Sequence, residues 1–441
     1  RVVLPSGEVR ELPGEELELV ADAEGTTGLI STITLKLRPL EREVVVAAAF
    51  GERSQALSAL EAIVRQGLPL WSLTLANAAL NSLRNRMPPQ LEHGRAHERH
   101  RAPEGYVLLA AFPESRSAAC LEPLRAIVAD ARGRLLSEDE AQAEWAERFH
   151  IMAVKRLGPS LIPFEVCLPL PGLLPALAAV EEGLKLPVAA EVMVASGLTQ
   201  PQAVILGFML HDERKLGYNF AFAGSLSALQ TAKKHGGRAY STGLYFAHEG
   251  AAVLGEERLQ RLRAFKASVD PQGILNPGKV LDGPGVFASF MRAAGKLGPA
   301  LRAVANAFPS PAGERFAPKK GIPGDIAWYA YACAQCGYCV DTCDEFYGRG
   351  WESHSPRGKW YFLRQVMEGR AKITQEWVDR FLICTTCEYC NVRCPVELPI
   401  EPAWLTMRGK LIHEQKRQTF PPFEMMAASL RKERNIWAAF A

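Results

Sequence analysis

Residues 333–343 read CAQCGYCVDTC, and residues 384–399 read CTTCEYCNVRCPVELP. Each stretch contains one run with the spacing Cys-x-x-Cys-x-x-Cys-x-x-x-Cys. Three cysteines spaced by three residues place their thiolates around one face of a cuboidal metal cluster, whereas the fourth cysteine points away from that face. The duplicated run therefore predicts two metal clusters within the last quarter of the sequence.

The same spacing occurs in bacterial two-cluster ferredoxins, in which the fourth cysteine of each run binds the other cluster. Pro395 follows the second run as this pattern requires, whereas Asp344 stands at the equivalent place in the first run. We therefore expect two [4Fe–4S] clusters with exchanged fourth ligands. The predicted ligands are Cys333, Cys336, Cys339 and Cys394 for cluster 1, and Cys384, Cys387, Cys390 and Cys343 for cluster 2.

Structural zinc is the alternative for these cysteines. Zinc is usually bound by paired Cys-x-x-Cys units with four ligands per ion, and three ligands per tight run fit that arrangement poorly. Eight of the 10 cysteines belong to the runs. Cys120 and Cys167 lie alone in apolar stretches, where we expect buried thiols and not a disulfide framework. This usage is typical of a reducing compartment.

The composition limits which classes of protein this chain can belong to. A chain of 441 residues with 48% hydrophobic and 22% charged residues is expected to form two or three globular domains. A net charge of +3 is too small to indicate nucleic-acid binding. No apolar run reaches the length of a transmembrane helix. We expect a cytoplasmic protein, with peripheral membrane association as the alternative.

The first 40 residues have the pattern of strands. Residues 2–12 predict a hairpin that turns at Ser6-Gly7, and residues 29–40 alternate apolar and polar side chains until Pro39. Between these segments, Gly25 and Gly28 permit close approach of the backbone to a ligand. An ordinary turn is the alternative for this glycine pair.

Residues 41–285 alternate strand and helix patterns, which predicts an α+β domain whose sheet carries helices on one face. Strands are expected at residues 43–50, 106–112, 164–171, 203–212 and 216–224. Helices are expected at residues 53–67, 137–157, 173–185, 225–237 and 255–270. Residues 286–325 are rich in proline, glycine and lysine after one short helix and predict a linker. Residues 326–441 predict an α-helical ferredoxin-like domain.

Three segments carry a resemblance to known families. ADAEGTTGLISTITLKLRP (residues 21–39) resembles the end of the FAD-binding domain of FAD-linked oxidases related to vanillyl-alcohol oxidase, which include the flavin subunit of glycolate oxidase. LRAFKASVDPQGILNPGKVL (residues 262–281) resembles the end of their cap domain. The cysteine region, with SPRGKWYFLRQV (residues 355–366), resembles the iron–sulfur subunit of glycolate oxidase and heterodisulfide-reductase subunits.

The resemblance implies a domain order and an FAD site. Residues 1–40 would be the C-terminal tail of the FAD-binding domain, 41–285 the cap or substrate domain, 286–325 a linker and 326–441 the two-cluster domain. Most of the FAD-binding domain would lie outside these residues, and we expect neither end of the sequence to be a natural domain boundary. The implied FAD-binding residues are Gly25, Thr26, Gly28, Ile30, Asn276 and Lys279.

The sequence departs from these relatives where many of them carry catalytic residues. Gly243-Leu244 stands near the expected Glu-His pair, and residues 217–222 lack the histidine of a Gly-Asn-x-His metal site. Tyr240, Tyr245 and His248 are substitute candidates for the acid/base, with packing roles as the alternative. Arg148 lies on the helix that carries a carboxylate-binding arginine in relatives, and a solvated helix-face arginine is the alternative.

Taken with its departures, the resemblance implies a flavin- and iron–sulfur-dependent dehydrogenase. It would oxidise a 2-hydroxy acid of the glycolate or D-lactate type and pass electrons through two clusters to a quinone or a redox partner protein, within a larger assembly or a longer chain. The alternative is an electron-transfer subunit of a larger redox complex, in which the flavin-like half is a docking scaffold. A third class, a nucleic-acid-binding protein with structural clusters, lacks the expected basic patch.

Overall fold

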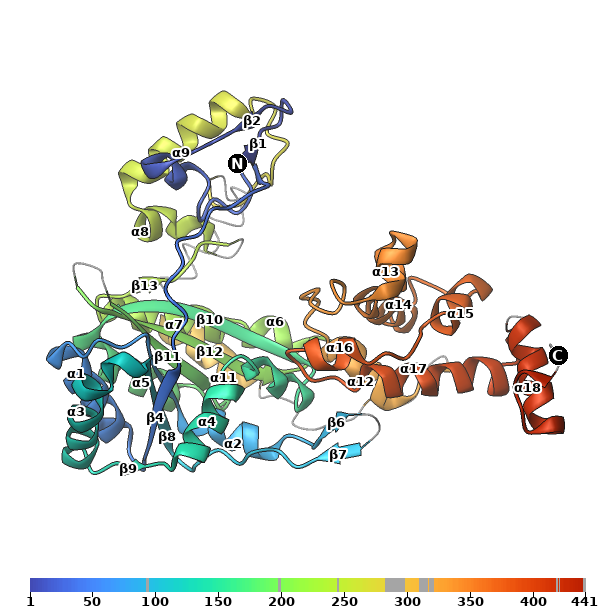
Figure 1. Cartoon of the computed structure of the whole chain (residues 1–441). Coiled ribbons are helices and arrows are strands. Elements are labelled where there is room, and N and C mark those ends of the chain that lie inside the picture. The colour runs from blue at the N-terminus through green and yellow to red at the C-terminus, as the bar shows by residue number, and fades with distance from the viewer. Residues whose placement is uncertain are drawn as a thin grey trace.

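The computed structural model describes residues 1–92, 95–196, 200–243, 246–281, 298–308, 316, 321–417, 419 and 421–438. Figure 1 shows three parts. We call them the cap (residues 43–243 with 298–308), the N-terminal module (residues 1–30 with 247–281) and the cluster region (residues 321–438).

The cap is built on an eight-stranded sheet in which every described neighbouring pair is antiparallel. This confirms the predicted α+β class. In spatial order the strands are β13 (Arg238–Ala239), β10 (Ser160–Pro169), β12 (Gln202–His211), β11 (Ala189–Ala195), β5 (Ser72–Ala76), β8 (Tyr106–Pro113), β4 (Glu43–Phe50) and β9 (Arg134–Leu135).

Four helices cover one face of this sheet and enclose the main core: α1 (Arg53–Gln66), α3 (Ser117–Asp130), α5 (Leu170–Gly183) and α7 (Ala223–Lys234). Leu60 and Phe112 are fully buried in this core. The helix α11 (Gly298–Ala307) packs against α7 and buries Ala305 there, so this part of the predicted linker segment belongs to the cap packing. The cysteines Cys120 and Cys167 are buried, as predicted.

The second face of the sheet is covered by shorter elements: α2 (Ala78–Arg86), α4 (Glu138–Glu147) and η3 (Ile151–Arg156). This corrects the expectation that helices lie on one face only. Successive strand residues point to opposite faces, so Phe112 lies in the main core while Ala111 contacts the side of α4. This second face carries most of the charged residues discussed below.

The N-terminal module joins the first residues of the chain to the end of the cap segment. Its elements are β1 (Val2–Val3), β2 (Val9–Arg10), η1 (Gly14–Leu19), β3 (Leu29–Ile30), η4 (Ala247–Glu249), α8 (Gly250–Leu254) and α9 (Glu256–Val269). The predicted hairpin is confirmed, with Val3 paired to Val9 and Gly7 in the left-handed region. Val2 and Leu4 belong to an apolar cluster that packs against α9.

The cluster region is helical, as predicted. Its helices are α12 (Gly324–Ala332), α13 (Asp344–Arg349), η5 (Glu352–His354), α14 (Pro356–Met367), α15 (Gln375–Leu382), α16 (Tyr389–Arg393), α17 (Ile400–Gly409), η6 (Lys410–Glu414) and α18 (Pro421–Glu433). Trp360 and Trp404 are fully buried at its centre with ring centroids 4.4 Å apart.

The remaining cap elements are the short helices η2 (Glu114–Arg116) and α6 (Gly217–Ala221) and the separate hairpin of β6 (Gln90–Glu92) and β7 (Arg95–His97). The helix α6 corrects the strand predicted at residues 216–224. The apolar residues Tyr218, Ala221 and Phe222 recur every three to four positions, which suits a helix packed on α7.

Two other predictions were wrong. The helix expected over residues 137–157 ends as α4 at Glu147 and resumes only as the 3-10 helix η3. In the segment 29–40, only Leu29 and Ile30 form a strand. The rest finds no partner strand among the described residues, and its alternating Ile33, Leu35 and Leu37 are exposed.

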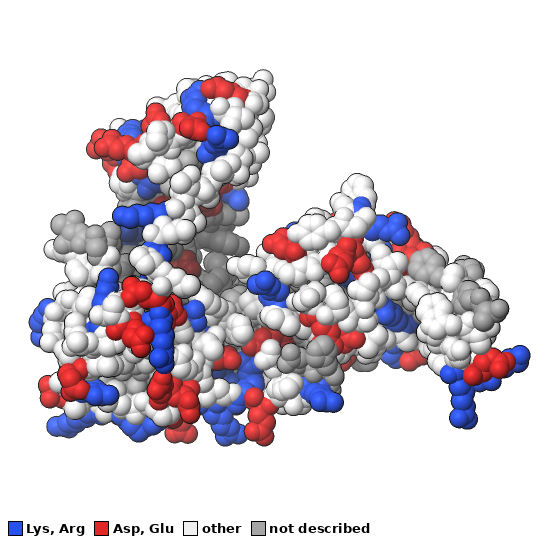
Figure 2. Space-filling model, viewed as in Figure 1, with Lys and Arg blue, Asp and Glu red and all other residues white. Residues whose placement is uncertain are grey.

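The surface charges and the apolar character of the helices agree with what the composition of the sequence indicates. On the face shown in Figure 2, basic and acidic side chains are interspersed without a large surface of one sign. Within the described residues, no helix combines the length and the apolar character needed to span a bilayer.

Gly207 of β12 provides a test of the cap packing. A Cβ at this position would lie 2.1 Å from the ring of Phe164, its cross-strand neighbour. We expect Gly207→Ala to destabilise the cap by about 1–3 kcal/mol through overpacking, measured by urea unfolding. Gly51→Ala is the control, because nothing lies within 4 Å of a Cβ there. Equal loss in both variants would contradict the packing argument.

Candidate functional site

The two cysteine runs share one backbone geometry. In the first run, Gln335 and Gly337 have positive φ angles of 55° and 89°. In the second run, Thr386 and Glu388 have positive φ angles of 60° and 62° at the equivalent positions. Left-handed residues are uncommon outside glycine. Their repetition at matching places shows that both loops wrap their cysteines in the same way.

The structure brings the eight cysteines together in two groups. One small cavity is lined by all four cysteines predicted for cluster 1: Cys333, Cys336, Cys339 and Cys394. Cys390 lies close enough to Cys384, Cys339, Cys387 and Cys343 for their charges to raise its pKa. Three of these four are the other cysteines predicted for cluster 2. This grouping follows the exchange of fourth cysteines expected from the sequence. The assignment of each ligand stays a prediction.

The chemistry of these donors fits a multivalent metal centre. Burial, with the other cysteines nearby, raises the pKa of Cys333 to about 11 and that of Cys339 to about 12. Four thiols so close together cannot all ionise unless a metal offsets their mutual repulsion. The Cys394 and Cys343 sulfurs also lie near backbone N–H groups that stabilise the thiolate. Hydrogen bonds of this kind tune iron–sulfur clusters.

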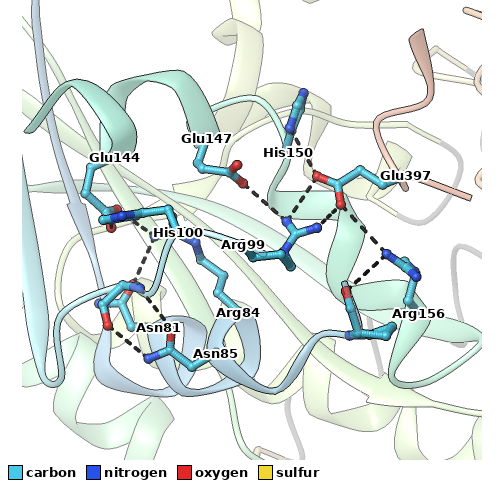
Figure 3. A network of polar contacts seen from close by, with 12 residues as sticks. Asn81, Arg84, Asn85, Arg99, His100, Glu144, Glu147, His150, Arg156 and Glu397 are labelled. Carbon is cyan, nitrogen blue, oxygen red and sulfur yellow. Dashed lines mark hydrogen bonds and ion pairs between the residues drawn. The ribbon is translucent and has the colours of Figure 1, made fainter. Parts of the chain in front are cut away.

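The loop after Cys394 carries the main polar contact between the cluster region and the cap (Figure 3). The Glu397 side chain is 1% exposed and forms two hydrogen bonds with Arg99, one of them 3.0 Å long. His150 Nδ1 lies 3.2 Å from the same carboxylate, and Arg156 lies 3.9 Å away. The backbone N–H of Glu397 donates to the carbonyl of Cys394 at 2.9 Å, so this network ends at a predicted cluster ligand.

The same contacts determine the charge of Glu397. Burial opposes its ionisation, but the hydrogen bonds from His150 and Arg99 outweigh this effect and lower its pKa to about 2. Ligand atoms of Glu147, His150 and Glu397 lie within 4.8 Å of one another. Arg99 contacts both carboxylates of this group, so these residues form an ion-pair network and not a cation site.

Arg148 lies on the second face of the sheet, where it lines a pocket with Arg84, Glu144, Glu147 and Glu191. Its guanidinium lies 3.9 Å from the Trp145 ring centroid. No described carboxylate lies within ion-pair distance of Arg148, and burial lowers its pKa.

Sequence reasoning missed Glu191, whose pKa burial raises to about 7. The alternation of residues along β11 could have predicted its burial on the second face, because its neighbours Ala190 and Val192 point into the main core. Alternation therefore directs the Glu191 carboxyl to the opposite face, beside Arg148.

A larger cavity of about 490 Å³ lies beside β10, near the end of the sheet that carries β13. Gly243 lines it where the Glu-His pair was expected, together with Tyr218, Thr242 and Glu165. Burial raises the pKa of Glu165, which sequence reasoning also missed. Arg148 does not line this cavity.

Tyr240 and His248 do not line the larger cavity either. Tyr240 is 50% exposed. The His248 side chain is buried, with Nε2 3.4 Å from Glu249. Tyr245 lies outside the described residues. Among the described candidates, Arg148, Tyr240 and His248 thus do not come together in either cavity.

The predicted flavin residues gather in the N-terminal module. Asn276 Nδ2 donates to the carbonyl of Glu24 at 2.5 Å, and a Cβ on Gly25 would lie 2.9 Å from the same amide. The Thr26 hydroxyl is buried and donates to the Ala23 carbonyl. A Cβ on Gly28 would clash with Val2. Ile30 is exposed and Lys279 is half-buried. Their contact with FAD stays a prediction.

A residue that sequence reasoning missed holds these flavin segments together. Lys266 Nζ donates to the Thr26 carbonyl at 2.9 Å, to Asp270 at 2.7 Å and to the Leu275 carbonyl at 2.9 Å. This lysine joins the glycine loop to the segment that ends in NPGK, and these are the two segments predicted to contact FAD.

The Arg99–Glu397 pair can be tested by removing the cation. We expect Arg99→Met to destabilise the contact between cap and cluster region by about 3–5 kcal/mol, because it leaves a buried carboxylate without its main partner. Differential scanning calorimetry and limited proteolysis between the two parts will measure this loss. Arg95→Met is the control, because Arg95 is exposed on β7. A variant at position 99 as resistant as the control would show that the pair does not hold the two parts together.

Comparison with known proteins agrees with this architecture. Residues 40–280, more than half of the chain, match the family described as FAD linked oxidases, C-terminal domain. Residues 332–399 match the 4Fe-4S dicluster domain.

Individual relatives match shorter segments. The glycolate oxidase iron-sulfur subunit of Escherichia coli (strain K12) is 36% identical over 103 residues, 23% of this chain and 24% of that protein. A ferredoxin:CoB-CoM heterodisulfide reductase subunit of Methanosarcina mazei is 32% identical over 77 residues, 18% of this chain and 43% of that protein. The chain thus aligns with less than half of either relative.

Among solved structures, an alkyldihydroxyacetonephosphate synthase matches with a TM-score of 0.41 and 13% identity, over 63% of this chain and 52% of that one. This likeness is too low to add to the argument. The two domain matches imply FAD and [4Fe–4S] clusters as cofactors. The chain belongs to the FAD linked oxidases, whose C-terminal domain it joins to a 4Fe-4S dicluster domain.

Proposed function

We propose that this chain is part of a dehydrogenase that oxidises a 2-hydroxy acid and passes the electrons through two [4Fe–4S] clusters to a quinone or a redox partner protein. The observation that carries the proposal is the contact between Glu397 and Arg99, which fixes a predicted cluster loop to the oxidase cap. The bound flavin would accept the two electrons of the substrate, and the clusters would carry them singly.

The cap residues would bind and orient the substrate. Arg148 has no described ion-pair partner, and its planar guanidinium suits a carboxylate in a bidentate arrangement. Stacking on Trp145 holds this guanidinium in place. We propose a 2-hydroxy acid as the substrate because of this arginine and because one relative is named a glycolate oxidase iron-sulfur subunit.

The N-terminal module supports a shared flavin site. The exposed alternating residues Ile33, Leu35 and Leu37 have the pattern of a strand that pairs outside the described residues. We propose that a nucleotide-binding domain, on a longer chain or on a partner subunit, covers this segment and supplies the rest of the FAD contacts.

The alternative function is an electron-transfer subunit whose cap is a docking scaffold. Gly243 favours it, because glycine cannot supply the acid/base expected there, and Tyr240 and His248 do not line the same cavity. Addition of 2-hydroxy acids to the assembled complex distinguishes the two functions. Anaerobic bleaching of the cluster absorbance by the substrate supports the dehydrogenase. Bleaching by a redox partner alone supports the electron-transfer subunit.

The cluster ligands can be tested through iron content. We expect the anaerobically purified chain to bind about eight Fe, two cubanes' worth. Cys343→Ser should perturb the cluster built on Cys384, and Cys394→Ser the cluster built on Cys333, as followed by electron paramagnetic resonance. Cys120→Ser is the control, because Cys120 is buried within the cap. One zinc ion per group of cysteines, without iron, would overturn the proposal.

The role of Arg148 can be tested by a conservative change. We expect Arg148→Lys to raise KM for the hydroxy acid about tenfold or more in the complete enzyme, because lysine keeps the charge but not the planar fork. Steady-state kinetics measure the change. Arg125→Lys on α3 is the control, because its side chain is 57% exposed. An unchanged KM would assign Arg148 to packing against Trp145.

A further inference from the structure

The cationic side chains near the predicted cluster ligands include four that have hydrogen-bond acceptors. Arg156, near Cys394, donates to the carbonyl of Pro88. Lys359 Nζ lies 3.2 Å from Glu345. Arg357 forms two hydrogen bonds with Glu352. Arg408 donates to the carbonyls of Phe381 and Cys384.

A fifth cation, Lys155, comes from the cap, as Arg156 does. Its ammonium group finds no acceptor within hydrogen-bond distance among the residues that the structure describes, although the side chain is partly buried.

The position of Lys155 is fixed by the contact between η3 and α12. These elements pack against each other, and Met152 of η3 contacts the core of the cluster region. The helix α12 ends at Ala332, directly before Cys333. Lys155 therefore lies where the cap meets the first cysteine run.

The charged groups with the largest effect on Lys155 are, in order, Cys333, Glu213, Arg364 and Cys336. Glu213 and Arg364 form an ion pair with each other at 2.8 Å, so their effects on Lys155 largely cancel. The remaining partners of the ammonium are two predicted ligands of cluster 1.

A partly buried ammonium without a partner is unfavourable unless an anion offsets it. A cubane held by four thiolates is anionic and gains one more negative charge on reduction. A fixed cation nearby therefore stabilises the reduced form more than the oxidised form. Net charge is one of the properties that set the potential of such clusters.

We propose that Lys155 is the counter-charge that the cap supplies to cluster 1, and that it raises the reduction potential of this cluster when the two parts are docked. Cluster 1 is then the cluster on the cap side of the pair, and its potential depends on that contact. This inference deepens the proposed function, because it rests on the grouping of the cysteines, but it does not depend on the identity of the substrate.

The test is a redox titration of the intact chain loaded with iron, followed by electron paramagnetic resonance of the reduced clusters. We expect Lys155→Met to lower the ratio of reduced to oxidised cluster 1 about tenfold at a fixed potential, a shift of about 59 mV for one electron. Cluster 2 should keep its potential. Cys343→Ser identifies the signal of cluster 2.

Two controls separate charge from packing. Lys155→Arg keeps the charge and should stay close to the wild-type potential, and Lys185→Met removes an exposed lysine of the cap and should change neither cluster. Unchanged potentials in Lys155→Met with full iron content would overturn the inference, as would an equal shift in Lys155→Arg. If the methionine variant binds less iron, Lys155→Gln is titrated and judged by the same criterion. Absence of iron from the wild-type chain would instead refute the proposed function.

Discussion

Repulsion between buried thiolates is the constraint on which the cluster region depends. Its eight cysteines lie in two groups, and burial raises the pKa values of Cys333 and Cys339 far above the range in which free thiols ionise at neutral pH. The helices around them are short: α13 has 6 residues and α16 has 5. Helices of this length are not stable alone. The region therefore depends on metal binding in addition to the core around Trp360 and Trp404.

The short segment from Cys394 to Glu397 connects the cluster loop to the cap. Glu397 follows Cys394 closely, and its carboxylate is buried only because Arg99 and His150 approach it from the cap. A buried charge of this kind specifies one docked arrangement more than it adds stability, since its desolvation offsets much of the attraction. The oxidase cap and the cluster loops are thereby held in one fixed relation.

The N-terminal module would form one half of the proposed nucleotide site. Lys266 ties the glycine loop at Thr26 to the segment after Asp270, so both are positioned before any ligand binds. The exposed Leu35 and Leu37 show that this part of the chain has apolar surface still to bury. Preorganised loops beside an open apolar segment are what a site shared between two domains requires.

The sequence by itself determined the features that depend on local spacing. The cysteine runs, the strands β4 and β8 and helices such as α1 and α14 follow from periodicity, turns and caps within a few residues. The strand predicted over residues 31–40 was wrong because an alternating pattern favours a strand but does not provide the partner strand that it needs. The short apolar stretch at residues 217–222 misled because helix and strand patterns overlap there.

Only the tertiary structure decided which distant residues meet. Arg99 and Glu397 are 298 positions apart, and no local pattern links them. Lys155, Glu191 and Lys266 gained their roles through burial against other elements, which the sequence around each does not encode. Local spacing thus predicts the metal ligands, whereas the charges around them depend on how the two parts of the chain dock.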